Sequence, residues 1–224
     1  MKYEEIMRKL KSLSDPSAVA GMKRFGISAD NTYGISIPNL RKISKEVGRD
    51  HQVAEQLWVS EIHEARILAC MIDDARMVTE GQMEGWAKGF DSWDVCDQCC
   101  GNLFDKTKFA YQKAKEWGTR KEEYVKRAGF VLMAELAVHD KKTADEEFLN
   151  FLPIIKRESV DDRNFVKKAV NWALRQIGKR SKNLNAKAIE TANEILRIDS
   201  RSSRWIASDA VRELTDYAVK KRLK

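Results

Sequence analysis

The sequence predicts an all-α protein built from HEAT-like helical repeats. Its 224 residues include only three prolines, and no Asn-Gly or Asp-Gly pair marks a β-hairpin turn. Tyr124-Val-Lys-Arg-Ala128 and Phe165-Val-Lys-Lys-Ala169 match at an offset of 41, and Trp205-Ile206 follows Phe165-Val166 after 40 residues. Helix pairs with a period near 40 are typical of HEAT-like repeats, which stack into a curved solenoid with a concave face. We therefore expect a single repeat domain over residues 1–224.

The helices of the N-terminal half follow from apolar residues at helical spacing and from start signals. Ser14 and Asp15 before Pro16 mark one helix start, and Pro38 lies where the first turn of another helix tolerates proline. We expect two short helices within residues 1–30, a loop over 26–37, and further helices at 39–47, 52–60, 62–76, 80–90 and 92–104.

Residues 164–182 form the most informative predicted helix. One side carries an apolar stripe formed by Val166, Ala169, Val170, Ala173, Leu174 and Ile177. The opposite side carries Lys168, Trp172, Arg175 and Lys179. An amphipathic helix normally gives this second side to solvent, so Trp172 has two interpretations. Either it packs beneath a neighbouring helix, or it belongs to a surface that meets a polyanion such as nucleic acid.

The positive charge is concentrated towards the C-terminal end. Residues 1–150 carry 23 Lys and Arg against 25 Asp and Glu, whereas residues 151–224 carry 18 against 9. A basic C-terminal third suits a phosphate backbone or an anionic membrane surface. No apolar run approaches the length of a membrane-spanning helix, and the first residues lack the apolar region of a signal peptide. We therefore expect a cytoplasmic protein with no membrane attachment.

The four cysteines favour free thiols over disulfides or a metal site. Cys96, Cys99 and Cys100 lie within five residues, and Cys70 stands apart. A zinc site needs four ligands, and neither a second cysteine pair nor paired histidines accompany Cys96-x-x-Cys99. We expect no metal, and free thiols in a reducing cytoplasm.

Two other helices carry candidate catalytic side chains. Trp93 and Asp97 are four residues apart and share one face of the predicted helix, for which Asp91 or Ser92 is a plausible N-cap. An isolated Trp-x-x-x-Asp more often contains an ordinary surface acid. The apolar residues next to this face are Val95, Cys96, Cys99 and Leu103.

The helix around residues 122–138 is apolar on both faces, with Val125, Gly129, Leu132 and Leu136 on one and Val131, Ala134 and Val138 on the other. Arg127 lies on the second face and is therefore expected to be partly buried. A partly buried arginine usually has an anionic partner. That partner is either a carboxylate, from Glu135 or Asp97, or a phosphate.

Together and in this order, the motifs resemble the AlkD-like DNA alkylation repair glycosylases. The resemblance covers most of the chain and is sharpest at Ser92-Trp-Asp-Val-Cys-Asp97, Lys126-Arg-Ala128 and Lys168-Ala-Val-Asn-Trp-Ala-Leu-Arg175. Weaker matches are Gly34-Ile-Ser-Ile-Pro38, Leu57-Trp58 and Glu64-Ala-Arg66. Some relatives have two adjacent tryptophans where this chain has Ser92-Trp93, and the cysteines of this segment depart from the family pattern.

The resemblance implies an all-helical solenoid whose concave basic face cradles duplex DNA. It implies that Trp93 and Trp172 are active-site tryptophans, Asp97 the catalytic carboxylate and Arg127 the active-site arginine. The implied enzyme is a DNA glycosylase of base excision repair that hydrolyses the N-glycosidic bond of cationic N3- or N7-alkylated purines. It needs no cofactor, and none of these four residues is a lysine that could form a Schiff base, which favours a monofunctional enzyme.

We expect basic side chains near these motifs to bind the DNA backbone. Arginines and hydroxyls in the loop Ser200–Arg204 precede a helix and suggest a further phosphate site. The candidate DNA-binding residues are Lys168, Arg175, Lys179, Arg180, Lys182, Arg201 and Arg204. The expected partner is double-stranded DNA carrying alkylated purines, bound by a monomer.

Two other functions compete with the enzyme. A non-catalytic HEAT-like protein that binds damaged or branched nucleic acid would need the basic third and the tryptophans but not Asp97. A protein-binding scaffold, as many helical solenoids are, gives no reason for Trp172 among cations. The presence of Trp93, Asp97, Arg127 and Trp172 together favours the glycosylase.

Overall fold

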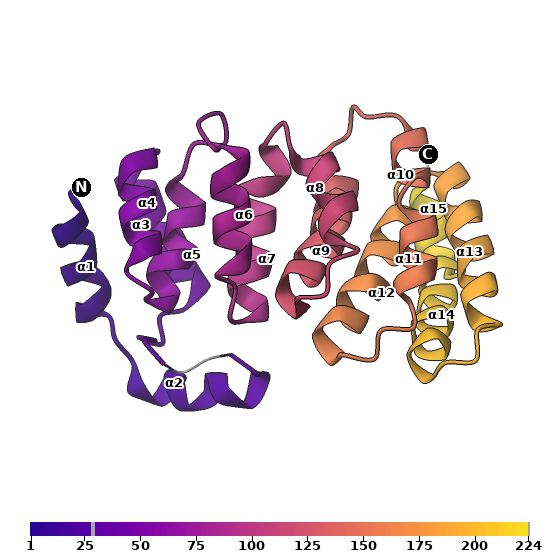
Figure 1. Cartoon of the computed structure of the whole chain (residues 1–224), viewed down its shortest axis with the longest axis horizontal. Coiled ribbons are helices and arrows are strands. Elements are labelled where there is room, and N and C mark those ends of the chain that lie inside the picture. The colour runs from indigo at the N-terminus through magenta and orange to yellow at the C-terminus, as the bar shows by residue number, and fades with distance from the viewer. Residues whose placement is uncertain (28–29, 224) are drawn as a thin grey trace. The chain divides into compact units, whose positions relative to one another are not determined.

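The structure is a computed structural model that describes residues 1–27 and 30–223 (Figure 1). Every regular element in these residues is a helix, which confirms the all-α prediction. The chain divides into two compact units, Met1–Lys108 and Phe109–Lys224, and each is described by itself. The expectation of a single domain over 1–224 stays a prediction. Part of the predicted loop over 26–37, residues 28 and 29, lies outside the described residues, as does residue 224.

The first unit packs its helices around α5, which contacts α3, α4 and α7 and is buried along most of its length (Figure 1). Its helices are α1 (Tyr3–Ser12), α2 (Pro16–Met22), α3 (Ile37–Val47), α4 (His51–Val59), α5 (His63–Ile72), α6 (Glu80–Lys88) and α7 (Trp93–Asn102), with the 3-10 turns η1 (Lys23–Phe25) and η2 (Phe104–Lys106). The side chain of Asp15 caps α2, as its position before Pro16 predicted. The indoles of Trp58 and Trp86 stack 4.2 Å apart and join α4 to α6.

The predicted helix 62–76 is too long, because α5 ends at Ile72. The next residue, Asp73, is extended and fully buried. Its carboxylate accepts hydrogen bonds from Nε2 of Gln82 at 2.7 Å and contacts Nδ1 of His51 at 2.7 Å. A buried carboxylate needs such partners, and meeting them draws the chain out of the helix.

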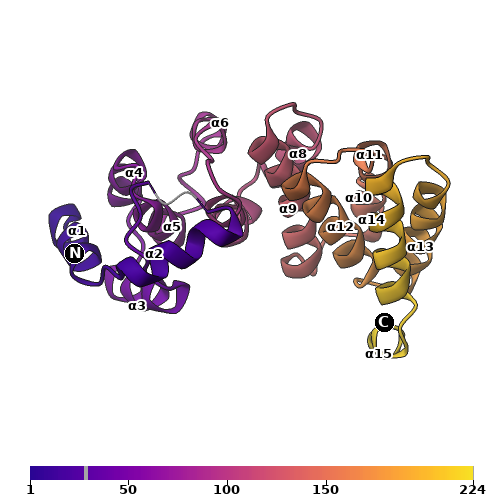
Figure 2. The same ribbon diagram turned by 90° about the horizontal axis from the view of Figure 1, so that it is seen from below.

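In the second unit, α12 is the central helix, with α9 against one side and α13 and α14 against the other (Figure 2). The helices are α8 (Ala110–Trp117), α9 (Glu123–His139), α10 (Asp145–Leu149), α11 (Leu152–Glu158), α12 (Asn164–Gly178), α13 (Lys182–Leu196), α14 (Arg201–Leu214) and α15 (Tyr217–Arg222). The predicted helix 164–182 is two helices. It ends at Gly178, and Ser181 caps α13 by accepting a hydrogen bond from the backbone of Leu184 at 3.1 Å.

The repeat seen in the sequence corresponds to packed neighbours. Tyr124 and Phe165 are each the second residue of their helix, α9 and α12, and their ring centroids lie 5.8 Å apart. Trp205 is the fifth residue of α14, one turn further along. Nζ of Lys167 lies 5.2 Å from the centroid of its ring. The aromatic residue of each copy therefore contacts the repeat before or after it.

The turn that begins the family resemblance is held by one buried carboxylate. Glu64 accepts backbone hydrogen bonds from Tyr33, Gly34 and Ile35 at 2.9, 2.6 and 3.1 Å. Gly34 has φ +79, and a Cβ there would lie 2.3 Å from the carbonyl oxygen of Asp15. The positive φ and the lack of space require glycine at 34, and the three backbone N–H groups require an acceptor such as the carboxylate of Glu64. Gly34 and Glu64 therefore position the segment that precedes α3.

The start of α7 is anchored to α5 by a histidine–carboxylate pair. Nε2 of His63 lies 2.8 Å from a carboxylate oxygen of Asp94, and both side chains are largely buried. Burial lowers the pKa of His63, but the hydrogen bond and charge of Asp94, with the charges of Glu64 and Asp91, outweigh burial and raise that pKa above 6.5. This contact fixes the first turn of α7, which carries Trp93.

The closest helix packing in the second unit predicts the effect of one methyl group. A Cβ on Gly129 of α9 would lie 2.2 Å from the backbone nitrogen of Gly118, which cannot move like a side chain. We expect Gly129→Ala to lower the free energy of unfolding by about 1–3 kcal/mol. Gly85→Ala in α6 meets nothing within 4 Å and should raise it by about 0.5–1 kcal/mol. Urea unfolding measures both, and a neutral Gly129→Ala would contradict this packing.

The His63–Asp94 pair predicts a pH dependence of stability. Because folding raises the pKa of His63, its contribution is fully present below pH about 6.5 and is lost as the pH rises through the folded-state value. In Asp94→Asn this loss should shrink, so the curve of unfolding free energy against pH should flatten between pH about 6.5 and the folded-state value. Urea unfolding from pH 5 to 8.5 measures it. As a control, in a His63→Gln background the Asp94 substitution should leave the slope of unfolding free energy against pH unchanged. Equal slopes for the wild type and Asp94→Asn, which both contain His63, would contradict the pairing.

Candidate active site

The first candidate pair lies in α7 of the first unit. Ser92 is the N-cap residue, and Trp93 and Asp97 follow on one face, each half-buried. The adjacent stripe of Val95, Cys96, Cys99 and Leu103 is fully buried, as predicted. The helix thus buries its apolar stripe and leaves the tryptophan and the carboxylate partly open to solvent.

The indole of Trp93 is held by the N-terminal segment. Its Nε1 donates a hydrogen bond of 2.8 Å to the carbonyl oxygen of Phe25. Trp93 also lines a largely apolar cavity of about 340 Å³, together with Met22, Ile35 and the His63–Asp94 pair. The Phe25 contact is backbone-mediated, so no side-chain pattern in the sequence could have indicated it.

The cysteines are part of the core. Cys70, Cys96, Cys99 and Cys100 are buried and carry free thiols. Burial, with a hydrogen bond to Cys70, raises the pKa of the Cys99 thiol well above its ordinary value. Among residues 1–27 and 30–223, no group of three or more histidine, cysteine or acidic side chains has the arrangement of a metal site. The cysteines that depart from the family pattern therefore fill the space beneath α7.

Arg127 lies in α9 of the second unit, a helix buried from Val125 to Ala137 apart from Glu135. Its side chain is almost fully buried, and its Nη1 donates a hydrogen bond of 2.6 Å to the carbonyl oxygen of Phe165. This contact joins α9 to the first turn of α12. Burial on both faces of α9 confirms the prediction, and it fixes the guanidinium in place.

Trp172 lies on α12, opposite a stripe whose members are all buried, as predicted. Its side chain is half-buried, and Lys168, one turn earlier, is exposed. Within the described residues, Trp172 takes part in no ring stack or hydrogen bond, and Lys168 in no ion pair. The indole therefore has an open part beside a cation available to a ligand.

The other two cations of this face are neutralised by α14. Nη1 of Arg175 binds Glu213 at 2.5 Å and lies 3.5 Å from Asp209, and Nζ of Lys179 binds Glu213 at 2.6 Å. Burial raises the pKa of the Glu213 carboxyl, but the hydrogen bond from Lys179 and the charges of Arg175 and Lys179 outweigh it and lower that pKa. Trp172 therefore stands among fewer free cations than the sequence alone suggested.

Arg180 has a structural role that the sequence did not indicate. Its side chain is only 8% exposed. The guanidinium donates hydrogen bonds to the backbone carbonyls of Ala137, Asp140 and Thr143, and lies over the ring of Phe148 at 4.1 Å. It joins the end of α12 to the chain that follows α9, so little of it is open to a ligand.

The predicted phosphate site at residues 200–204 contains hydroxyls that are already hydrogen-bonded within the protein. These residues form the cap and first turn of α14, and the hydroxyl of Ser200 caps the helix. The hydroxyls of Ser202 and Ser203 are buried and bind the backbone oxygen and the hydroxyl of Ser159. Two predicted DNA-binding arginines, Arg201 and Arg204, are exposed there, the second paired with Asp199 at 2.9 Å, and Lys182 is exposed at the start of α13.

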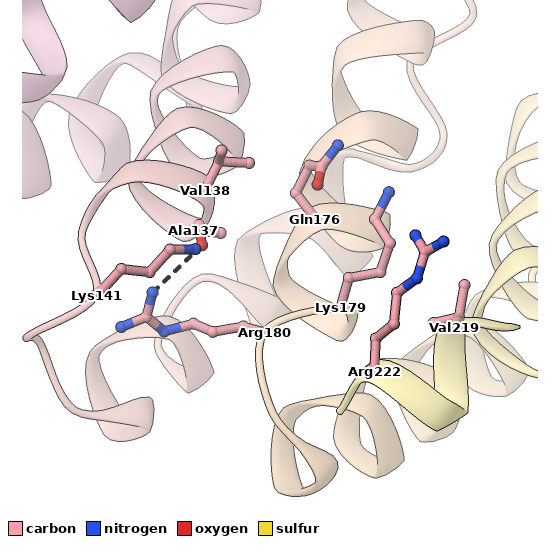
Figure 3. A pocket seen from close by; sticks show the side chains of 8 residues that line it. All are labelled: Ala137, Val138, Lys141, Gln176, Lys179, Arg180, Val219 and Arg222. Atoms are coloured by element: carbon pink, nitrogen blue, oxygen red, sulfur yellow. Dashed lines mark hydrogen bonds between the residues drawn. The ribbon is translucent and has the colours of Figure 1, made fainter. Parts of the chain in front are cut away.

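A cluster of cations missed by the sequence lies at the C-terminal ends of α9 and α12. It surrounds a cavity of about 290 Å³ whose lining includes Lys141, Gln176 and Arg222 (Figure 3). These residues come from three segments far apart in the sequence, so no local motif joins them.

Among the described helices none is long and apolar enough to cross a bilayer.

Comparison with known proteins agrees with this architecture. A solved structure described as "a new family of proteins related to the HEAT-like repeat DNA glycosylases with affinity for branched DNA structures" is 19% identical over 95% of each chain, with a TM-score of 0.78. This score shows a HEAT-like repeat fold and confirms the predicted fold class. An engineered protein, 12% identical over 79% of this chain and 90% of that chain, reaches a TM-score of 0.39, too low to indicate a shared fold. A search of curated proteins gives no match.

The sequence also matches a protein family. The model of the family described as "DNA alkylation repair enzyme" matches residues 6–214, a segment that contains Trp93, Asp97, Arg127 and Trp172. The match runs from α1 to the end of α14 and leaves α15 outside. Over nearly its whole length, then, this chain belongs to the DNA alkylation repair enzyme family.

Proposed function

We propose that this protein is a monofunctional DNA glycosylase that hydrolyses the N-glycosidic bond of cationic N3- or N7-alkylated purines in duplex DNA. The observation that carries the proposal is the presence of Trp93, Asp97, Arg127 and Trp172 within the segment matched by the DNA alkylation repair family. The first two lie on one face of α7 and the other two on α9 and α12. No cofactor enters the proposed reaction.

The chemistry suits these residue types. An N3- or N7-alkylated purine is a cation and leaves the sugar as a neutral base, so little acid catalysis is needed. The transition state resembles an oxocarbenium ion, and a fixed anion beside C1′ stabilises its charge. Asp97 supplies such an anion and can orient the attacking water. Indole faces attract cations by about 0.5–2 kcal/mol each, so Trp93 and Trp172 favour the alkylated nucleotide over a neutral one.

Arg127 would act on the strand and not on the base. Its guanidinium is almost fully buried and fixed by the carbonyl of Phe165. The planar donors of a guanidinium fit a phosphate, which would have to compete with the contacts that bury Arg127. In this proposal Arg127 holds a phosphate near the lesion and keeps the strand in register.

The proposed backbone contacts differ in how far they are open to a ligand. Lys168, Lys182 and Arg201 are exposed and have no ion pair among the described residues, so they are the first candidates, followed by Arg204. Arg175 and Lys179 reach a phosphate only in competition with Glu213. Arg180 contributes through its charge, because its donors already bind carbonyl oxygens.

A second candidate is the non-catalytic binding of branched or damaged DNA. It is favoured by the solved structure with the same fold, whose description gives that protein affinity for branched DNA structures. This function would use the cations and tryptophans and leave Asp97 without a role. The dependence of base release on Asp97 separates the two candidates.

We expect Asp97→Asn to reduce release of free N7-methylguanine from duplex DNA by about 10²-fold or more, the scale of losing one electrostatic stabiliser. Duplex binding should stay close to that of the wild type, because the substitution keeps the size of the side chain and one of its acceptor oxygens. Single-turnover release of radiolabelled base and fluorescence anisotropy measure the two quantities. Asp162→Asn, at an exposed carboxylate, is the matched control. Wild-type turnover by Asp97→Asn would exclude its catalytic role.

Charge reversal at Lys168 tests the α12 face without breaking an ion pair. We expect Lys168→Glu to weaken duplex binding several-fold and to reduce the slope of log affinity against log salt by about 1. Lys45→Glu, at an exposed position of α3, makes the same charge change in the other unit and should have a smaller effect. Anisotropy titrations from 50 to 200 mM salt give both slopes. Equal losses for the two variants would place the DNA away from Lys168.

A further inference from the structure

A cationic cavity of about 290 Å³ lies in the second unit, where the C-terminal ends of α9 and α12 approach α15 (Figure 3). Its lining residues are Ala137, Val138, Lys141, Gln176, Lys179, Arg180, Val219 and Arg222. Two of them, Val219 and Arg222, belong to α15, which lies beyond the segment 6–214 matched by the family. The cavity is therefore completed by a helix outside the matched family segment.

The charge of this cavity is one-sided. Its lining includes four cations and no carboxylate. Two of the four are already engaged, Lys179 by Glu213 at 2.6 Å and Arg180 by backbone carbonyls. The other two, Lys141 and Arg222, form no ion pair within the described part of the chain. Cations that line one cavity with no carboxylate in its lining repel each other, so an anion between them would stabilise this end of the unit.

The donors fit one kind of anion. Lys141 and Arg222 reach the cavity from the end of α9 and from α15, and the side-chain amide of Gln176, between them, has no hydrogen-bond partner within the described residues (Figure 3). A guanidinium, an ammonium and an amide together offer the planar and point-charge donors that bind phosphate oxygens. Ala137, Val138 and Val219 add an apolar wall, which suits the sugar attached to such a phosphate.

We propose that this cavity binds a phosphate group of a nucleic-acid strand, as a contact separate from the proposed catalytic residues. The proposal rests on the proposed function only in taking DNA as the ligand. Lys179 links the two regions, because it lines the cavity and also shares the α12 face with Trp172. Seven residues of helix span about 10 Å, so one strand that passes Trp172 can also reach the cavity.

The test reverses the two cations that have no ion pair. Lys141→Glu with Arg222→Glu should weaken binding of a fluorescent duplex about tenfold or more and reduce its salt slope by about 1. The matched control, Lys142→Glu with Lys221→Glu, makes the same charge change at neighbouring exposed positions outside the cavity and should have a much smaller effect. Lys141→Gln with Arg222→Gln repeats the test without new charge, and circular dichroism melting verifies folding of each variant.

Three outcomes would overturn the proposal. Equal losses in the cavity and control variants would assign the effect to net charge. Unchanged duplex binding by both cavity variants would show that no strand reaches the cavity. If inorganic phosphate raises the melting temperature of the wild type but not of the cavity variants, while their DNA binding is unchanged, the cavity binds a small phosphorylated molecule instead.

Base release, measured in parallel, separates this inference from the proposed function. Cavity-dependent duplex binding by a wild-type protein that releases no base would overturn the glycosylase and leave the cavity's role intact. Base release that depends on Asp97, together with duplex binding that is unchanged in the Lys141 and Arg222 variants, would support the glycosylase and overturn the role of the cavity.

Discussion

The second unit depends on the two-sided packing of α12. One side of this helix is apolar and fully buried, and α9 is fastened to its first turn by the hydrogen bond from Arg127 to the carbonyl of Phe165. The other neighbour, α14, meets it through a polar seam in which Asn171 binds Asp209 at 2.8 Å and Arg175 binds Glu213. Both seam pairs are 38 residues apart, a separation close to the repeat period near 40. This packing decides which part of α12 is left for a ligand.

The ion pairs of this seam reduce the number of cations that the basic C-terminal third leaves open to a ligand. The C-terminal third carries twice as many basic as acidic residues, yet two of its acids, Asp209 and Glu213, lie against Arg175 and Lys179. Arg180 donates its hydrogen bonds to carbonyl oxygens at the ends of helices, where the helix dipole also favours a cation. A basic segment is thus not the same as a basic surface. The cations left for a polyanion lie at Lys168 and at the ends of the helices.

The sequence predicted what depends on local periodicity and failed where distant residues decide. The stripes of α7 and α12, the two-sided burial of α9 and the cap of α2 all follow from spacing within one helix. The end of α5 at Ile72 depends instead on partners of Asp73 from α4 and α6. The burial of Ser202 and Ser203 depends likewise on Ser159, more than 40 residues away. The cationic cavity has the same origin, since it joins the ends of three helices.

The neutralised cations beside Trp172 fit the proposed substrate. A glycosylase that selects a cationic base gains nothing from strong positive potential at the base, because like charges repel it. It needs cations along the phosphates, and indole faces and a carboxylate at the lesion. On α12 the residue one turn before Trp172, Lys168, has no ion pair among the described residues, whereas Arg175, on the following turn, is paired with carboxylates of α14. Under the proposed function, Glu213 and Asp209 would thus lower the positive potential around the indole, and Lys168 would keep its charge for the DNA backbone.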